Sequence, residues 1–256
     1  MHAQRDAGSV DSEAADTPAV QQFHPRVTSF RSRRASLNEA QQEVWERLWP
    51  RLGTQARARS GATETDDPAQ PLDTLSWFGR EAPIIVEIGS GTGTSTLAMA
   101  QVEQHVDVVA VEVYRRGLAQ LLSAIDRTDV SNIRMVRGDG VDVLERMFPT
   151  GSLTGVRVFF PDPWPKARHH KRRLLQRHTV ALIADRLRPG GVFHAATDHA
   201  GYAEQIAETG DAEPRLRRAE AGEVLPISVQ RPITKYETKA RDVGSPVSEL
   251  LWVRRP

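Results

Sequence analysis

The 256-residue sequence contains no cysteine. Disulfide bonds, thiolate metal sites and cysteine nucleophiles are therefore excluded, and the absence fits a reducing compartment such as the cytoplasm. No apolar run approaches the roughly 20 residues that a membrane-spanning helix needs, and the N-terminus lacks the apolar core of a signal peptide. We therefore expect no membrane segment. We also expect no metal site, because neither His105 nor His199 has a second ligand at metal spacing.

Net charge is also nearly absent, because 34 Lys and Arg residues stand against 33 Asp and Glu residues. This balance conceals a local cluster: six Lys or Arg and three His residues fall between Lys166 and His178, with no acid before Asp185. A second basic segment, the arm, spans Arg26 to Arg34. Clustered cations in an otherwise balanced chain favour a polyanionic partner over a generally basic surface.

From about residue 83, short apolar runs alternate with segments of helical periodicity. This pattern predicts an α/β fold with a doubly wound, mostly parallel sheet of seven strands, helices on both faces and a C-terminal antiparallel strand pair. The expected strands cover 84–88, 106–113, 132–138, 156–160 and 192–196, followed by the terminal pair at 224–229 and 250–253. The expected helices cover 94–104, 115–126, 141–147, 174–186 and about 200–208.

The first 82 residues have a different composition. Residues 1–25 form a polar leader for which we expect disorder, and residues 26–82 hold the basic arm, a helix and a loop. The helix should run from a cap at Asn38 to about Leu52, with the loop over 53–72. Residues 83–256 then make up the α/β domain.

A glycine-rich turn joins the first predicted strand of that domain to the first helix. Its sequence, Glu87-Ile-Gly89-Ser-Gly91-Thr-Gly93, suits close approach of a ligand to the backbone. The spacing is not that of the dinucleotide fingerprint, and the carboxylate of Glu87 would repel a pyrophosphate. A cationic sulfonium ligand that carries an ammonium group is easier to accommodate, so the turn favours S-adenosylmethionine (AdoMet) over NAD.

Two further acids stand at the ends of the next two strands. Glu112, about 20 residues beyond the glycines, is placed to accept ribose hydroxyls, and Asp139 could hold an adenine amino group. A single acid at a strand end is more often a helix cap or a solvated residue. Three acids and a glycine loop at consecutive strand ends together favour a nucleoside pocket.

The segment from Pro161 to Arg173 follows a fourth buried strand and combines Asp162, two further prolines and Trp164 with the basic cluster. Active sites of α/β enzymes lie at this edge of the sheet. Trp164 could stack on a base or only stiffen the turn, and an isolated basic run could be a solvated helix face. Beside a candidate catalytic carboxylate, the combination predicts chemistry on a nucleic acid.

These residues resemble the bacterial tRNA (guanine-N7-)-methyltransferase family of class I, Rossmann-like methyltransferases. The resemblance covers about residue 26 to the C-terminus, and its most specific part is Phe160-Pro-Asp-Pro-Trp-Pro-Lys166 followed by Arg-His-His. The other matching elements are Val86 to Gly91, Val111 to Val113, Gly138-Asp139, Thr197-Asp198, Thr234 to Glu237, and the arm.

The resemblance implies methylation of N7 of the guanine at position 46, in the variable loop of tRNA, by a monomer or homodimer. It implies the following roles: Asp162 is catalytic; Glu87, Gly89, Gly91, Glu112, Asp139 and Asp162 bind AdoMet; Lys166, Asp198, Thr234, Lys235, Tyr236 and Glu237 hold the guanine; Arg168, His169, His170, Lys171, Arg172 and Arg173 contact RNA.

Three other functions compete with this one. An amino-group methyltransferase acting on nucleic acid would use Asp/Asn-Pro-Pro-aromatic, whereas Asp162-Pro163-Trp164 lacks the second proline before the aromatic residue. A non-catalytic RNA-binding module on a relict cofactor fold would not need all the pocket acids. An NAD-dependent oxidoreductase is disfavoured by Glu87 and by the glycine spacing.

Overall fold

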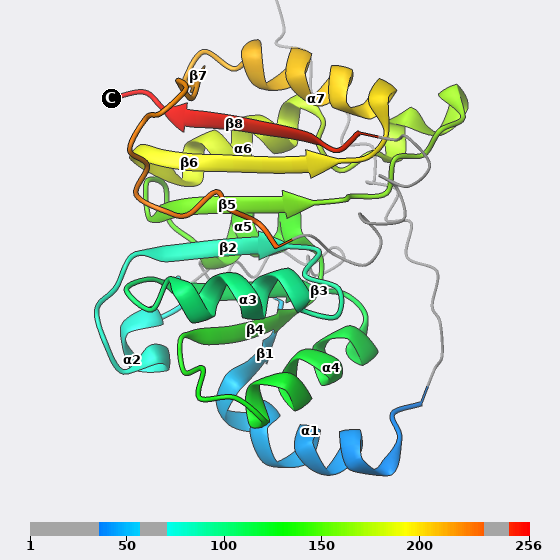
Figure 1. The fold of residues 1–256 in the computed structure, drawn as a ribbon, viewed down its shortest axis with the longest axis vertical. Coiled ribbons are helices and arrows are strands. Elements are labelled where there is room, and N and C mark those ends of the chain that lie inside the picture. The colour runs from blue at the N-terminus through cyan, green and yellow to red at the C-terminus, as the bar shows by residue number, and fades with distance from the viewer. Residues whose placement is uncertain (1–35, 57–70, 233–245) are drawn as a thin grey trace, which may run out of the picture.

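The computed structural model describes residues 36–56, 71–232 and 246–256 and shows an α/β fold built on one eight-stranded sheet (Figure 1). Its strand order is β1-β4-β3-β2-β5-β6-β8-β7, and every pairing is parallel except those that β8 makes with β6 and β7. The strands are β1 Gly53–Gln55, β2 Ile84–Ile88, β3 Asp107–Glu112, β4 Ile133–Arg137, β5 Leu153–Phe159, β6 Leu187–Thr197, β7 Leu216–Arg218 and β8 Ser248–Arg254. The helices are α1 Glu39–Leu52, α2 Thr74–Phe78, α3 Thr94–Val102, α4 Arg115–Asp126, α5 Gly140–Met147, α6 Arg177–Arg186, α7 Ala200–Asp211 and the 3-10 helix η1 Ala167–Arg172.

Helices cover both faces of the sheet because the central strands are buried on both sides. Along β2, Ile84, Val86 and Ile88 pack in the core that includes residues of α2, α5, α6 and α7. Ile85 points the other way, into the core formed with α1, α3 and α4. The period-two alternation of a strand thus supplies two hydrophobic cores, one on each face.

The sheet reverses its direction of growth between β2 and β5. From β2 the chain adds β3 and β4 on one side, then returns to place β5 against the other edge of β2 and continues outward to β6. The loops after β2 and β5 therefore diverge at this switch point, which opens a crevice at the carboxyl ends of the strands.

Most predicted elements are confirmed. Helix α4 and strand β2 coincide with the expected ranges, and α1 begins at the predicted cap, where the Asn38 side chain accepts the Gln41 N–H at 2.8 Å. Trp45, Leu48 and Leu52 of α1 are buried against α4. The predicted fold class is confirmed, with one strand more than expected.

The additional strand lies at the start of the region predicted as a loop, and a short helix that was not predicted lies just after that region. Gly53–Gln55 forms β1, which pairs with β4 in parallel, and α2 follows at Thr74–Phe78. A three-residue strand that begins directly after a helix has too few residues to show alternation, so periodicity could not reveal it.

The predicted strand at 224–229 is wrong. Residues 224–229 contain no strand, and β7 at Leu216–Arg218 pairs with β8 in its place. The alternating apolar residues there reflect burial without ladder pairing: Ile227 packs on the α1, α3 and α4 face. The Ser228 N–H donates to the side chain of Glu103 at 2.6 Å, where a strand would have used a neighbouring carbonyl.

Several predictions fall on residues outside the described ranges. These are the polar leader, the basic arm, most of the 53–72 loop, and Thr234, Lys235, Tyr236 and Glu237. The division of the chain at residues 25 and 82 stays a prediction; within the described part, α1 and β1 belong to the same sheet assembly as the later strands. No helix in the described ranges is long and apolar enough to cross a membrane.

Candidate active site

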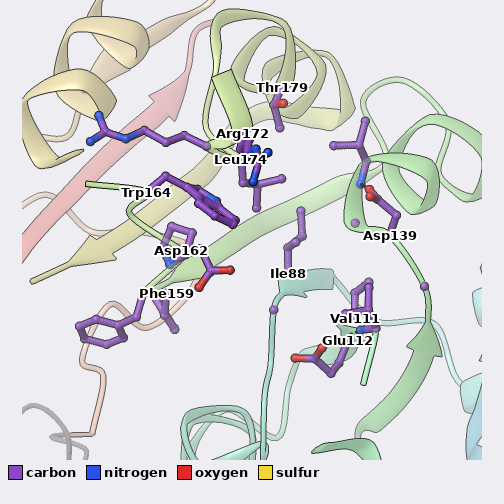
Figure 2. Close-up of a pocket in the computed structure, with 18 of the residues that line it drawn as sticks. Ile88, Val111, Glu112, Asp139, Phe159, Asp162, Trp164, Arg172, Leu174 and Thr179 are labelled. Atoms are coloured by element: carbon purple, nitrogen blue, oxygen red, sulfur yellow. Dashed lines mark hydrogen bonds between the residues drawn. The ribbon is translucent and has the colours of Figure 1, made fainter. Parts of the chain in front are cut away.

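A cavity of about 300 Å³ opens at the switch point of the sheet, at the carboxyl ends of β2, β3, β4 and β5. Figure 2 shows Glu112, Asp139 and Asp162 arranged around the side chain of Ile88, which lies at the end of β2. Three of the sequence-predicted acids therefore meet in one pocket, each contributed by a different strand end.

The glycine turn after β2 leaves backbone open toward a ligand. Gly89 and Gly91 have φ angles of 78° and 57°, in the left-handed region that strains other residues. Gly89 lines the cavity, and a Cβ atom placed on it would meet nothing within 4 Å. Gly91 does not line the cavity, but its N–H donates to Glu112 at 2.9 Å and so ties the turn to β3.

Glu112 is fixed at the end of β3 by backbone donors. Its Oε1 accepts the N–H groups of Val113 and Tyr114 at 2.7 and 2.9 Å, and its Oε2 accepts that of Gly91. A carboxylate offers about four acceptor positions, so one remains on Oε2 for a ligand hydroxyl. Asp139 caps α5 by accepting the Val141 N–H at 2.8 Å and lines the cavity beside it.

Glu87 lies beneath the glycine turn and does not line the cavity. Its side chain is buried, Oε1 accepts the Thr96 hydroxyl of α3 at 2.9 Å, and Oε2 has no hydrogen-bond partner. Burial raises the pKa of Glu87 to about 7, although Arg157 and the Thr96 hydroxyl act in the opposite direction. A buried carboxylate with an unsatisfied oxygen would be stabilised by a cation bound at the turn.

We expect Glu87→Gln to stabilise the cofactor-free protein at high pH. The pKa of this carboxyl group is higher in the folded protein than the usual 4.5, so the free energy of unfolding decreases as pH rises from 4.5 to 7. Glutamine does not ionise and therefore does not cause this decrease. The free energy of unfolding should increase by up to about 3 kcal/mol at pH 8 and change little at pH 4.5. Urea denaturation at both pH values measures the difference, and an equal gain at both would contradict the assigned cause.

The turn after β5 that carries Asp162 is strained. Phe160 and Trp164 have φ angles of 49° and 43°, and they are the non-glycine residues with positive φ in the described ranges. Such conformations cost on the order of 1–3 kcal/mol each and persist only where the surrounding structure enforces them. Between them, Asp162 is exposed, faces the cavity (Figure 2) and makes no hydrogen bond to the described residues.

Arg173 supplies part of that enforcement. Its side chain is only 3% exposed, and its Nε donates to the Pro163 carbonyl at 2.7 Å. Its Nη1 donates to Gln205 of α7 at 2.6 Å, and the guanidinium lies 4.7 Å from the Tyr202 ring. Arg173 thus braces the Asp162 turn and also lines the cavity, and its contact with RNA stays a prediction.

The rest of the basic cluster lies at the surface beside the cavity. Lys166, Arg168 and Lys171 are exposed, and Lys171 and Arg172 also line the cavity. Desolvation and the neighbouring cations lower the pKa of His169. His170 is half-buried, with its Nε2 enclosed.

Trp164 lies between this cluster and the cavity. Its ring packs edge-on against His169 at 5.8 Å, and Arg172 lies 5.2 Å from its centroid. These contacts tie Trp164 to the basic cluster, and Trp164 also lines the cavity, so its stacking on a base and its packing in the turn both stay predictions.

Some site residues were missed by sequence reasoning. Tyr114 and Phe160 line the cavity; Tyr114 follows the motif Val111 to Val113, and Phe160 is the first residue of the Phe160 to Lys166 motif, positions that could have indicated them. Arg157 stands alone inside an apolar strand and was passed over as part of that strand; it is fully buried. Lys166 and Asp198, predicted to hold the substrate, are exposed and lie outside the cavity lining.

The cavity fits AdoMet, the cofactor that this fold implies. Two carboxylates stand at its rim for the hydroxyl and amino groups of a nucleoside, and apolar side chains such as Ile88 and Phe160 line it. Glu87, with its unsatisfied oxygen, is two residues before the open glycine turn. No group of three or more His, Asp or Glu side chains suited to a metal occurs in the described part of the chain. Fold and site together define an AdoMet-dependent methyltransferase.

Comparison with known proteins narrows this class. Residues 81–250 match the family model described as "Putative methyltransferase". The chain is 65% identical to the tRNA (guanine-N(7)-)-methyltransferase of Mycolicibacterium gilvum, over 96% of this chain and 95% of that protein. It is 60% identical to the protein of the same name from Mycobacterium avium, over 100% and 98% of the two chains. The chain therefore belongs to the tRNA (guanine-N7-)-methyltransferase family.

Proposed function

We propose that this protein transfers a methyl group from AdoMet to N7 of the guanine at position 46, in the variable loop of tRNA. The observation that carries the proposal is the Asp162 carboxylate, held in a strained turn between the acid-lined cavity and an exposed basic cluster. Membership in the family supports the reaction and the tRNA substrate. The position within tRNA rests on the sequence resemblance.

The cofactor would be held by the strand-end acids. Glu112 would accept the ribose hydroxyls, Asp139 would hold the adenine amino group, and Asp162 would contact the cofactor from the other side of the cavity. Glu87, Gly89 and Gly91 would hold the cationic methionine end. When bound, AdoMet supplies an electrophilic methyl group on a sulfonium centre.

The chemistry at guanine requires no general base. N7 carries an in-plane lone pair and no proton, so the protein must only align it and stabilise the positive charge that develops on the ring. Asp162 would accept hydrogen bonds from the guanine N1–H and amino group, which is consistent with its lack of a hydrogen-bond partner among the described residues. Lys166, Asp198 and Thr234 to Glu237 would complete the guanine site.

The form of the RNA substrate follows from where N7 lies. N7 faces the major groove, which is deep and narrow in A-form RNA. The target guanine must therefore be displaced from a regular helix, as a variable-loop guanine can be. Lys166, Arg168 and Lys171 would bind the surrounding phosphates, with the protein acting in the cytoplasm as a monomer or homodimer.

The test of this proposal uses unmodified tRNA and AdoMet labelled in its methyl group. We expect label in the tRNA, and chain cleavage at N7-methylguanine should map it to position 46. Label in another base, or at another atom of guanine, would refute the assigned reaction. Label in N7-methylguanine at a different position would refute only the site within tRNA.

We expect Arg168→Glu to weaken tRNA binding about tenfold at low salt. Arg168 is exposed at the start of η1, and the loss of one phosphate contact should reduce the slope of log affinity against log salt by about one. Filter binding over a salt series measures both quantities. Arg127→Glu is the matched control, because Arg127 is an exposed arginine after α4 and outside the cluster. Equal effects of the two substitutions would show only a general charge effect.

A further inference from the structure

A row of buried polar side chains crosses the sheet on the face covered by α1, α3 and α4. Glu87 of β2, Arg157 of β5 and His194 of β6 are consecutive Cα partners in neighbouring strands, and each is at most 2% exposed. Partners in register point to the same face of a sheet whose strands lie about 4.8 Å apart. These three side chains are therefore neighbours inside the core.

The row is poorly satisfied, which is unusual for buried polar groups. Glu87 Oε2, Arg157 Nε, Arg157 Nη1 and His194 Nδ1 have no hydrogen-bond partner among the described residues. The remaining donor of Arg157, Nη2, contacts Glu103 Oε2 at 2.6 Å and the Ser228 carbonyl at 2.9 Å. Glu103 caps the C-terminal end of α3. Arg157 thus contacts the carboxylate of Glu103 and neighbours that of Glu87. Two of its nitrogen atoms, Nε and Nη1, donate no hydrogen bond to the described residues.

The charge of Glu87 depends on these neighbours. From α3, Thr96 donates to it and Glu103 repels it; from β5, Arg157 attracts it; its partner in β3, Ala110, carries no charge. Burial raises the pKa of Glu87 to about 7, Glu103 raises it further, and Arg157 lowers it. Near neutral pH, the fraction of ionised Glu87 is therefore sensitive to both members of the Arg157–Glu103 pair.

We propose that Arg157 is a positioning residue for the cofactor: it keeps the Glu87 carboxylate ionised beneath the glycine turn, and Glu103 opposes this action. Arg157 reaches the ligand only through Glu87, whose negative charge attracts the cationic methionine end. This inference rests on the proposed placement of that end at the glycine turn. It gives the lone arginine inside an apolar strand a role beyond packing.

The test compares two substitutions that break the same ion pair but act on Glu87 in opposite directions. Calorimetry would give the dissociation constant of AdoMet from pH 6 to 9 for the wild type, Arg157→Met and Glu103→Gln. Arg157→Met should weaken binding about tenfold at pH 7 and recover toward wild-type affinity at pH 9. Glu103→Gln should move the pH midpoint of binding downward and strengthen binding at pH 6.

If Arg157 had a purely structural role, the two substitutions would not shift the pH midpoint of AdoMet binding in opposite directions. Equal weakening by both variants at every pH would overturn the proposal. If Arg157→Met fails to fold, Glu103→Gln alone still decides the question, together with direct titration of the Glu87 carboxyl by carbon-13 NMR in the cofactor-free protein. Glu103→Gln should lower that titration midpoint, and an unchanged midpoint would refute the proposal.

Two controls separate this inference from the proposed cofactor contact. Arg134→Met removes another largely buried arginine, which bonds backbone carbonyls such as that of Trp77; it should lower stability without moving the pH midpoint. Glu87→Gln should remove the protein's contribution to the pH dependence. If Glu87→Gln binds AdoMet like the wild type, the proposed contact is wrong. If its profile is flattened but Arg157→Met and Glu103→Gln shift nothing, only the role of Arg157 fails.

Discussion

Replacing Asp162 with alanine is expected to reduce the rate of methyl transfer by about 10²–10³-fold, the range found when one preorganised polar group is removed from an active site. Binding of tRNA should change less than about threefold, because Asp162 carries negative charge and adds nothing to phosphate binding. Single-turnover transfer to unmodified tRNA, measured beside filter binding of the same tRNA, tests both statements.

The control for this result is Asp129→Ala. Asp129 is also exposed but lies in the loop that precedes β4, away from the cavity-forming ends of the strands. It should leave both rate and affinity unchanged. Asp162→Asn adds a second comparison, because it keeps an acceptor oxygen and loses the charge. Parallel losses of transfer and tRNA affinity in Asp162→Ala would remove the catalytic assignment.

Replacing Arg173 with methionine is expected to have the second large effect. The substitution leaves the Pro163 carbonyl and the Gln205 side chain without their donor and removes the contact with Tyr202. Each buried acceptor that is left without its donor costs about 1–3 kcal/mol. The positive-φ residues Phe160 and Trp164 would lose support, so methyl transfer should fall even under conditions where the variant remains folded.

Urea denaturation and single-turnover rates well below the unfolding midpoint separate these two effects. Arg177→Met is the control, since Arg177 is exposed at the start of α6 and should tolerate the change. A variant that loses stability but keeps the wild-type rate when folded would show that Arg173 serves packing alone. Arg173→Lys should restore part of the stability and less of the rate, because an ammonium group cannot reproduce the fork of a guanidinium.

Most of the fold could be predicted from local patterns in the sequence. The strand Ile84–Ile88 is an uninterrupted apolar run followed by glycines, and helix α4 has a buried stripe at helical spacing. Both signals are local, so both elements were predicted with the observed bounds. The acids Glu112 and Asp139 stand at the ends of such strands, and parallel strands bring their carboxyl ends to one edge. Their meeting in one cavity was predictable for that reason.

Other features depend on partners far apart in the chain. Residues 224–229 have the apolar alternation of a strand, but Glu103 and Arg157 hold the backbone at Ser228, and β8 pairs with Leu216–Arg218 instead. Nothing in the local pattern distinguishes these outcomes. Gly53–Gln55 likewise becomes a strand only because β4 offers it an open edge.

The sequence by itself determined the class of fold, the cofactor acids, the Pro-Asp-Pro-Trp turn and the relation to one family, because each is written in adjacent residues. Only the tertiary structure decided which role each arginine has. Arg168 remains in solvent, Arg173 is drawn inward to brace the turn, and Arg157 is buried beside Glu87 and Glu103. The physical reason is that an arginine's role follows from its burial and its partners, and both are set by contacts between distant parts of the chain.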